Sequence, residues 1–270
     1  MKILNNIEQG TEEWLLERMN CVTGTKLKKV LGNEESQRHL IAELISEEMT
    51  GQLKSQASTS QMERGNAEEV FSIKEFANRY NKKVDTVGMI KSDEGWYGLS
   101  PDGVIYNEKG VITEAYETKC PDSKNRILYE IENALPFSET GLMSSFVKKD
   151  ELYEALDEKG IEYDPKSTMK DLELLLPEED RGKPSTKAPW HGIPYIYKPQ
   201  CLHYFINIDT LERLYFGIYD NRIKDPEKKL YVVVLERKDI VQDIAKAKNS
   251  LEAFRKKWLK WKEIINPSNF

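Results

Sequence analysis

The fold is decided by two stretches of sequence, Ser100-Pro101-Asp102-Gly103 and Tyr116-Glu117-Thr118-Lys119-Cys120-Pro121. The first predicts a turn that carries an acid, because Pro-Asp-Gly is a common turn sequence. The second ends an apolar run. Side chains two positions apart on a strand point to the same face, so Glu117 and Lys119 project together. Between the stretches, two apolar runs flank the polar residues 107–110, a pattern typical of a hairpin that brings Asp102 back beside Glu117.

Two acids and a lysine gathered in this way suit the hydrolysis of a phosphodiester. The substrate is anionic, so attack by water needs a divalent metal that neutralises charge and lowers the pKa of a bound water. Mg²⁺ takes hard oxygen ligands, usually a few carboxylates. Each half of the pattern also has a simpler interpretation, as an ordinary turn and as a solvated ion pair on a strand. Taken together, the two halves resemble the ligand set of a Mg²⁺-dependent nuclease of the PD-(D/E)xK type.

Four further motifs surround these stretches. They are residues 9–18 with 22–25, residues 64–69, Gln200 on an expected late helix, and the apolar run 231–237. In this order the six motifs resemble those of lambda exonuclease and the YqaJ-type viral recombinase nucleases, over roughly residues 7–125 and 195–262. The resemblance implies an α/β fold, a PD-(D/E)xK restriction-endonuclease-like core with a central mixed sheet flanked by helices.

The resemblance assigns the metal ligands residue by residue. Asp102 and Glu117 would be the principal ligands, and the carbonyl oxygen of Thr118 would complete the set. Glu69 would be an outer or second-metal ligand, because the family places a helical Glu four residues after a Gly. The adjacent Glu68 does not fit that spacing. Without the family pattern, both glutamates would be interpreted as solvated charges on a helix.

The remaining assignments concern catalysis and the DNA end. Together with the two acids, Lys119 would be the catalytic lysine, and Gln200 would sit beside it and contact the attacking water or the scissile group. Three residues match the family's pocket for the 5′-phosphate of the DNA end: Arg18, Thr25 and Ser100. The family often has Ser where Thr25 stands. Threonine keeps the hydroxyl donor, but its extra methyl group narrows the pocket.

For the whole protein, the resemblance implies a Mg²⁺-dependent 5′→3′ double-strand DNA exonuclease of phage or prophage recombination, with Mn²⁺ as a substitute metal. Such an enzyme resects double-stranded DNA ends to 3′ overhangs for a single-strand annealing protein. The family further implies a ring-shaped homotrimer in the cytoplasm of a bacterial host cell. Two alternatives are a non-catalytic DNA-end-binding or scaffold protein and a structure-specific endonuclease. The intact Asp102, Glu117 and Lys119 argue against the first, and the phosphate-pocket residues argue against the second.

The composition is that of a soluble globular protein of one or two domains, with 270 residues of which 39% are hydrophobic and 32% charged. No run approaches the roughly 18 apolar residues of a membrane span, and the start lacks the apolar core of a signal peptide, so no membrane association is predicted. The three histidines show no ligand spacing. Three scattered cysteines without a C-x-x-C pair predict reduced cytosolic thiols rather than a disulfide framework or a zinc site: Cys21, Cys120 and Cys201.

The net charge of −6 is distributed unevenly. Residues 148–181 contain twelve acidic and six basic side chains, which accounts for the whole net charge. Residues 246–262 contain seven basic side chains and one acidic one. A chain that is neutral outside one acidic segment, and that carries a local basic stripe, is compatible with binding a phosphate backbone.

Hydrophobic periodicity and capping residues predict the order of the elements. The expected helices are 11–19, 23–31, 36–50 with Ser36 as its cap, 61–80, 198–208 and a final helix of some 25 residues. The expected strands are 84–91, 96–99, 103–106, 111–119, 211–219 and 229–236. Alternation of this kind predicts an α/β core with a mixed sheet. The core is expected to comprise residues 1–136 and 193–270, with residues 137–192 inserted as a separate helical module.

The inserted module is predicted to contain two short helices around an extended link. The first helix, 149–159, is ended by Gly160, and the second begins at Thr168, where Asp171 completes a capping box. The pattern resembles SAP or HeH modules, but its acidity opposes DNA contact, so DNA contact, docking of a protein partner and structural elaboration all stay open. The leucines expected to join the helices are Leu152, Leu156, Leu172, Leu175 and Leu176.

The final helix carries an apolar seam with alternating spacings of three and four. Such a seam predicts packing against the core or against a neighbouring subunit. The basic residues occupy other faces, which form either a solvated surface or the wall of a DNA channel. The seam consists of Leu251, Phe254, Trp258, Trp261 and Ile265.

Overall fold

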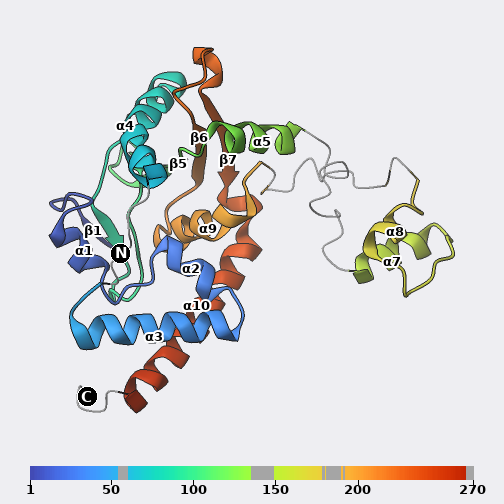
Figure 1. The fold of residues 1–270 in the computed structure, drawn as a ribbon, viewed down its shortest axis with the longest axis horizontal. Helices are drawn as coiled ribbons and strands as arrows, with labels where there is room; N and C mark the ends of the chain where they lie inside the picture. The colour runs from blue at the N-terminus through green and yellow to red at the C-terminus, as the bar shows by residue number, and fades with distance from the viewer. Residues whose placement is uncertain (54–59, 135–148, 178–179, 181–189, 191, 266–270) are drawn as a thin grey trace. The chain divides into compact units, whose positions relative to one another are not determined.

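The computed structural model describes the chain except for residues 54–59, 135–148, 178–179, 181–189, 191 and 266–270 (Figure 1). The chain forms two compact units. The first unit comprises Met1–Ser123 and Pro194–Phe270, and the second comprises Lys124–Ile193. The predicted start of the insert, residue 137, lies outside the described residues.

A four-stranded mixed sheet forms the centre of the first unit. In spatial order its strands are β4 (Gly103–Tyr106), β5 (Ile112–Lys119), β6 (Arg213–Tyr219) and β7 (Leu230–Glu236). The inner strands β5 and β6 run parallel, and each outer strand is antiparallel to its neighbour. The inner strands are largely buried and rich in aromatic and β-branched residues, as expected for strands covered on both faces. The predicted mixed sheet is therefore confirmed.

The predicted hairpin between β4 and β5 is also confirmed. The side-chain oxygen of Asn107 accepts two backbone N–H hydrogen bonds from within the turn, both at 3.0 Å. Gly110 has a φ of 72°, a left-handed conformation that glycine adopts without steric cost. The pairing register of the hairpin places Asp102, just before β4, at the level of Glu117 on β5.

A second, smaller sheet is antiparallel and was predicted only in part. It consists of β1 (Lys2–Leu4), β2 (Met89–Lys91) and β3 (Gly98–Leu99), in that order. The expected strands 84–91 and 96–99 are thus shorter than predicted, and β1 was not predicted. A three-residue edge strand carries too few residues to show the alternation by which strands are recognised in a sequence.

The helices of the first unit lie where the sequence predicts them. They are α1 (Glu12–Arg18), α2 (Gly24–Val30), α3 (Glu34–Thr50), α4 (Ser60–Tyr80), α9 (Lys198–Asn207) and α10 (Val241–Ile265), with 3-10 turns η1 (Tyr195–Tyr197), η2 (Pro226–Lys228) and η3 (Arg237–Asp239). The predicted cap of α3 was wrong, because Asn33 caps it and accepts a 2.9 Å hydrogen bond from the N–H of Ser36. Gly51 ends this helix at a φ of 63°, as predicted.

Helix α4 runs beside strands β5 and β6 (Figure 1). The ring of Phe76 stacks on that of Tyr116, with centroids 4.1 Å apart, and both side chains are fully buried. Ile105, Tyr215, Tyr219 and Leu230 complete the buried apolar cluster. Stacked aromatic pairs of this kind stabilise beyond the area that they bury. The cluster therefore fixes the helix that carries Glu69 against the strand that carries Glu117.

Helix α10 follows the predicted seam only over part of its length. Leu251, Phe254 and Trp258 are buried as predicted, whereas Trp261 and Ile265 are 44% and 52% exposed. Four of its basic residues form ion pairs with acids of the same unit, and the charges of these four are therefore neutralised within the chain. The pairs are Lys248 with Asp209, Arg255 with Glu94, Lys257 with Glu34, and Lys262 with Glu48.

The second unit contains α5 (Ser123–Ala134, which was not predicted), α7 (Lys149–Glu158) and α8 (Met169–Glu173). Gly160, at a φ of 64°, follows α7, and the N–H of Asp171 donates to the Thr168 hydroxyl at 3.2 Å, which is one of the two bonds of the predicted capping box. Leu175 is 45% exposed, so its predicted burial was wrong. The fully buried leucines of this unit are Leu152, Leu156, Leu172 and Leu176.

Candidate active site

Asp102, Glu117 and Lys119 meet where the β4–β5 hairpin begins and ends. Strand β4 starts only at Gly103, so the backbone N–H of Thr118 has no β4 residue opposite it and donates instead to the Asp102 carboxylate at 2.7 Å. The Lys119 ammonium forms an ion pair with Oε1 of Glu117, whose side chain is fully buried. The sequence prediction that these three side chains lie together is confirmed.

Burial and neighbouring charges shift the pKa values of Asp102 and Lys119. Burial raises the pKa of Asp102, and the Glu117 carboxylate raises it further, while the ammonium of Lys119 opposes the shift. Burial alone would lower the pKa of Lys119, but the carboxylates of Glu117 and Asp102 outweigh it and raise this pKa. Like charges held close together in a buried site are relieved by a cation.

The donor set fits a hard divalent cation. Asp102 and Glu117 offer carboxylate oxygens, the ligands that Mg²⁺ and related ions prefer. Glu69 lies within electrostatic range of Lys119 and Glu117. Burial raises the pKa of Glu69, the Lys119 ammonium lowers it, and the Glu117 carboxylate raises it. In the part of the chain that the structure describes, however, no three His, Cys, Asp or Glu side chains lie close enough together to hold a metal. Glu69 therefore does not form a group of three possible ligands with Asp102 and Glu117.

Glu68 and Glu69 occupy different environments on α4. Glu68 is buried and pairs with Arg64 at 2.8 Å, and the same arginine donates to the carbonyl oxygen of Cys120 at 2.8 Å. Glu69 instead interacts electrostatically with Lys119 and Glu117. Glu68, through Arg64, therefore links α4 to the end of β5. Of the two glutamates, Glu69 is the one that interacts electrostatically with Glu117 and Lys119.

A second tether between α4 and β5 lies three residues after Glu69. The hydroxyl of Ser72 lies 2.7 Å from that of Tyr116 and 2.6 Å from that of Thr118, the two residues that flank Glu117. All three side chains are buried. Gly217 on β6 makes room for the tyrosine, since a Cβ there would lie 2.1 Å from its hydroxyl oxygen. These contacts fix the position of α4 along β5.

Ser72→Ala is expected to lower the free energy of unfolding by about 1–3 kcal/mol, because it removes two short buried hydrogen bonds and leaves the hydroxyls of Tyr116 and Thr118 with the long contact of 3.4 Å between them. Denaturant unfolding followed by circular dichroism measures the change. Ser250→Ala is the matched control, since that serine on α10 donates to the carbonyl of Lys246 in its own helix. Equal stability of the two variants would show that the Ser72 contacts contribute nothing.

Helix α9 supplies the other side of the site. The Tyr204 hydroxyl donates to Oε2 of Glu117 at 2.5 Å, and the Tyr197 ring centroid lies 5.7 Å from Nζ of Lys119. Gln200 lies one turn before Tyr204 and packs towards α2, where a Cβ on Gly24 would lie 3.2 Å from its Cγ. Its predicted contact with Lys119 is not seen among the described residues. Sequence reasoning missed Tyr204, although its position four residues after Gln200 puts both on one helix face.

Of the three residues predicted to form the phosphate pocket, Arg18 and Ser100 contact each other, and Thr25 does not contact this pair. Arg18 donates to the Ser100 hydroxyl at 3.2 Å, and its guanidinium lies 4.2 Å over the ring of Trp14. Trp14 also donates to Ser100, at 2.9 Å. Burial lowers the pKa of Arg18, which nevertheless stays charged. Thr25 is exposed and its hydroxyl lies 3.3 Å from that of Thr23, so it contributes no direct contact to the Arg18–Ser100 pair.

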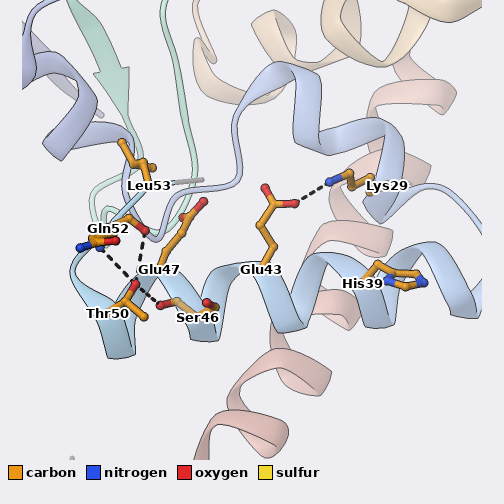
Figure 2. Close-up of a pocket in the computed structure, with 8 residues that line it drawn as sticks. All are labelled: Lys29, His39, Glu43, Ser46, Glu47, Thr50, Gln52 and Leu53. Carbon is orange, nitrogen blue, oxygen red and sulfur yellow. Dashed lines mark hydrogen bonds and ion pairs between the residues drawn. The ribbon is translucent and has the colours of Figure 1, made fainter. Parts of the chain in front are cut away.

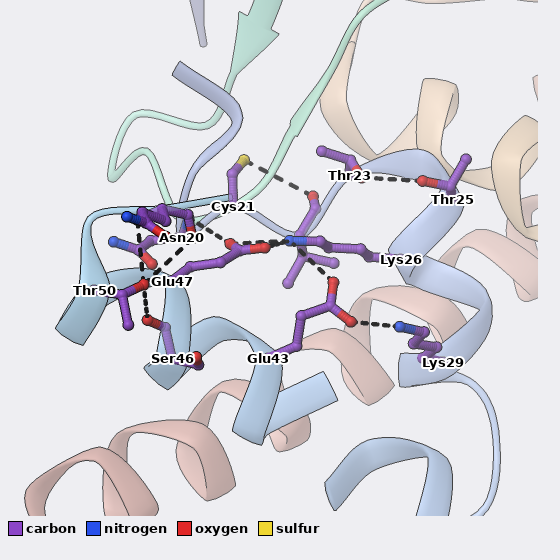
Figure 3. A network of polar contacts seen from close by, with 12 residues as sticks. Asn20, Cys21, Thr23, Thr25, Lys26, Lys29, Glu43, Ser46, Glu47 and Thr50 are labelled. Carbon is purple, nitrogen blue, oxygen red and sulfur yellow. Dashed lines mark hydrogen bonds and ion pairs between the residues drawn. The ribbon is translucent and has the colours of Figure 1, made fainter. Parts of the chain in front are cut away.

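A surface hollow above α3 is separate from these residues (Figure 2). Its polar network joins α2 and α3, since Lys26 pairs with Glu47 at 2.9 Å and with Glu43 at 3.5 Å (Figure 3). The N–H of Asn20, which has a φ of 54°, donates to the same Glu47. These charges are already paired within the chain, so the network stabilises the packing of α2 on α3. Residues lining the hollow are Lys29, His39, Glu43, Ser46, Glu47, Thr50, Gln52 and Leu53.

A mixed sheet that brings together an acid and a Glu-x-Lys pair fits the core of a PD-(D/E)xK nuclease. The sequence model of the protein family described as the YqaJ-like viral recombinase domain matches residues 13–138 of the chain. Residues 13–138 therefore resemble the YqaJ-type nucleases, which confirms the predicted resemblance and the predicted enzyme class, a nuclease. Nucleases of this kind generally use divalent metal ions.

Two solved structures share the fold. The alkaline exonuclease LHK-Exo from Laribacter hongkongensis has a TM-score of 0.62 at 19% identity, over 95% of this chain and 97% of that chain. LHK-Exo in complex with dAMP has a TM-score of 0.62 at 20% identity, with the same coverage. No curated protein matches the chain. None of the described helices is both long enough and apolar enough to cross a membrane.

Proposed function

We propose that the protein is a Mg²⁺-dependent 5′→3′ exonuclease that acts on double-stranded DNA ends and leaves 3′ overhangs. The single observation that carries the proposal is the cluster at the base of the β4–β5 hairpin, in which the half-buried Asp102 and Lys119 surround the fully buried Glu117. The fold shared with LHK-Exo, an alkaline exonuclease, supports the same reaction class.

Each residue of the cluster has a role that its position supports. Asp102 and Glu117 would hold the divalent ion, with the carbonyl oxygen of Thr118, and Glu69 would act from outside this set. The ion would neutralise phosphate charge and lower the pKa of a water. Lys119 projects from the same strand face as Glu117, where it would orient that water towards the phosphorus. Gln200 would contact the water or the scissile group, and Mn²⁺ would replace Mg²⁺.

The Arg18–Ser100 pair favours an exonuclease over a structure-specific endonuclease. Ser100 precedes Asp102 by two residues, so their Cα atoms are at most about 7.6 Å apart. A guanidinium held by a serine and a tryptophan offers charge-assisted hydrogen bonds that suit a terminal phosphate. A terminal phosphate bound there would bring the first phosphodiester of the strand towards the acids. Thr25 would join this pocket only through a shift of α2 or through the bound DNA.

The decisive experiment compares linear duplexes with 5′-phosphate and 5′-hydroxyl ends, and a closed circle, with and without Mg²⁺. The proposal predicts metal-dependent degradation of each strand from its labelled 5′ end. The 3′ ends should persist as single-stranded overhangs, and the circle should stay intact. Cutting of the circle would favour the endonuclease alternative. Binding of ends without any hydrolysis, in Mg²⁺ or Mn²⁺, would favour the non-catalytic scaffold.

The assembly and partners are proposed from the family. We propose a homotrimer that passes its 3′ overhang to a single-strand annealing protein in the cytoplasm of a bacterial host. The exposed end of α10, with Trp261 and Ile265, offers apolar surface for a contact between subunits. Sedimentation equilibrium with and without DNA measures the number of subunits.

Arg18→Ala is expected to reduce the preference for 5′-phosphate over 5′-hydroxyl ends by about 10–100-fold, since hydrogen bonds to charged groups contribute roughly 1.5–3 kcal/mol. Initial rates on the two duplexes give the preference directly. Arg38→Ala, which removes an exposed arginine of α3, is the matched control and should keep the wild-type preference. If wild-type protein degrades both duplexes equally, the phosphate pocket is assigned wrongly.

A further inference from the structure

Tyr204 bridges the two segments that carry the acids. Its side chain is fully buried on α9. The hydroxyl donates to Oε2 of Glu117 at 2.5 Å and accepts from the backbone N–H of Asp102 at 3.2 Å. One hydroxyl group therefore contacts the end of β5 and the turn before β4 at the same time.

These contacts leave Glu117 little freedom. Its Oε1 is paired with Lys119 and its Oε2 with Tyr204, and the side chain has no exposure to solvent. Each carboxylate oxygen can accept more than one interaction, so a cation can still bind while both partners remain. The two partners hold the plane of the carboxylate, and with it the direction in which its free lone pairs point.

The backbone contact has a second consequence. The carboxylate of Asp102 is held by the N–H of Thr118, and its backbone is held by Tyr204. The hydroxyl of Tyr204 thus limits how far the Asp102 turn can move from Glu117. Partners that orient metal-binding side chains typically change metal affinity by 10–100-fold when they are removed.

We propose that Tyr204 is a positioning residue that holds Asp102 and Glu117 in register for a divalent cation. The inference rests on the proposed function, because it requires the two acids to be metal ligands. Tyr204 itself touches neither the cation nor the DNA in this scheme. It acts through the orientation of Glu117 and through the position of the Asp102 turn.

Tyr204→Phe tests the inference, because it removes the hydroxyl and keeps the buried ring. The probe is Mn²⁺ alone, titrated by calorimetry into the full chain without DNA. We expect the dissociation constant for Mn²⁺ to rise about 10–100-fold. We also expect the Mn²⁺ concentration for half-maximal DNA degradation to rise similarly, with much of the rate recovered at saturating metal. Tyr215→Phe is the matched control, since this buried tyrosine of β6 contacts Arg213 through its hydroxyl, and it should keep the wild-type value.

Thermal unfolding of the metal-free variants separates positioning from a structural role. A drop in stability for Tyr204→Phe with an unchanged Mn²⁺ dissociation constant would overturn the inference and leave a merely structural tyrosine. That outcome, with wild-type protein still binding Mn²⁺ and degrading DNA, leaves the proposed function standing. Wild-type protein that neither binds Mn²⁺ nor degrades DNA would overturn the proposed function and the inference together.

Discussion

Glu117→Gln is expected to reduce the degradation of linear duplex DNA by roughly 10³-fold or more in saturating Mg²⁺. A neutral amide cannot supply the charge that holds a divalent ion, and the ion contributes several kcal/mol of stabilisation to the transition state. Glutamine keeps the side-chain volume and an oxygen that can accept from Tyr204, so the buried site keeps its shape. Release of acid-soluble nucleotides from a uniformly labelled duplex measures the rate, and Asp102→Asn should give a loss of similar size.

DNA binding supplies the necessary control for these variants. Both should still bind a 5′-phosphorylated duplex in Ca²⁺ or without metal, because the Arg18–Ser100 pair is untouched. Glu114→Gln, at the opposite end of β5, replaces a carboxylate that pairs with Lys82 and Arg213 and should leave the rate unchanged. Near-wild-type degradation by folded Glu117→Gln would remove the metal site from this mechanism.

The centre of the site could be predicted because it depends on local geometry. The two-residue period of a strand puts Glu117 and Lys119 on one face whatever the rest of the fold does. The hairpin signal at residues 107–110 then fixes the register that returns Asp102 to Glu117. These assignments need no knowledge of distant contacts. The choice of Glu69 over Glu68 instead depends on the family resemblance, which places a helical Glu four residues after a Gly.

The supporting residues could not be predicted in the same way, because they depend on contacts distant in the sequence. Tyr204 reaches Glu117 across 87 positions of the chain, and Ser72 reaches Tyr116 across 44. A tyrosine or serine on an amphipathic helix is ordinarily interpreted as packing or surface, and nothing in its neighbours names its partner. Only the packing of α4 and α9 on the sheet converts these residues into partners of the acids.

Differences from the expected burial lie at the ends of regular patterns. A three-four spacing continues through Trp261 and Ile265 on α10, but the core against which the helix packs ends near Trp258, so the other expected partner of these two side chains is a neighbouring subunit. Leu175 follows α8, where the helical period no longer decides which side chain points inwards. Periodicity shows which residues share a face, whereas burial also requires a partner opposite that face.

Lys119→Met is expected to reduce degradation by roughly 10³-fold or more while leaving Mn²⁺ binding intact or slightly tighter, a combination that the acid variants cannot give. The ammonium pairs with Oε1 of Glu117 and therefore opposes a cation there, so its removal does not weaken metal binding. In the proposed mechanism, its loss instead removes the group that orients the attacking water, an interaction realised only in the reaction. Methionine keeps an unbranched apolar stem beside Tyr197.

The contrast between rate and metal affinity is what tests the role of the lysine. Lys82→Met is the matched control, because Lys82 pairs with Glu114 at 2.7 Å near the start of the same strand and is remote from Asp102 and Glu117 in the register. It should keep both the rate and the Mn²⁺ dissociation constant. A Lys119→Met protein that loses Mn²⁺ binding in parallel with its rate would mean that Lys119 serves the metal site rather than the water. If Lys119→Met instead keeps the wild-type rate, Lys119 has no role in the reaction. Its ion pair with Glu117 would then be a structural contact on the strand.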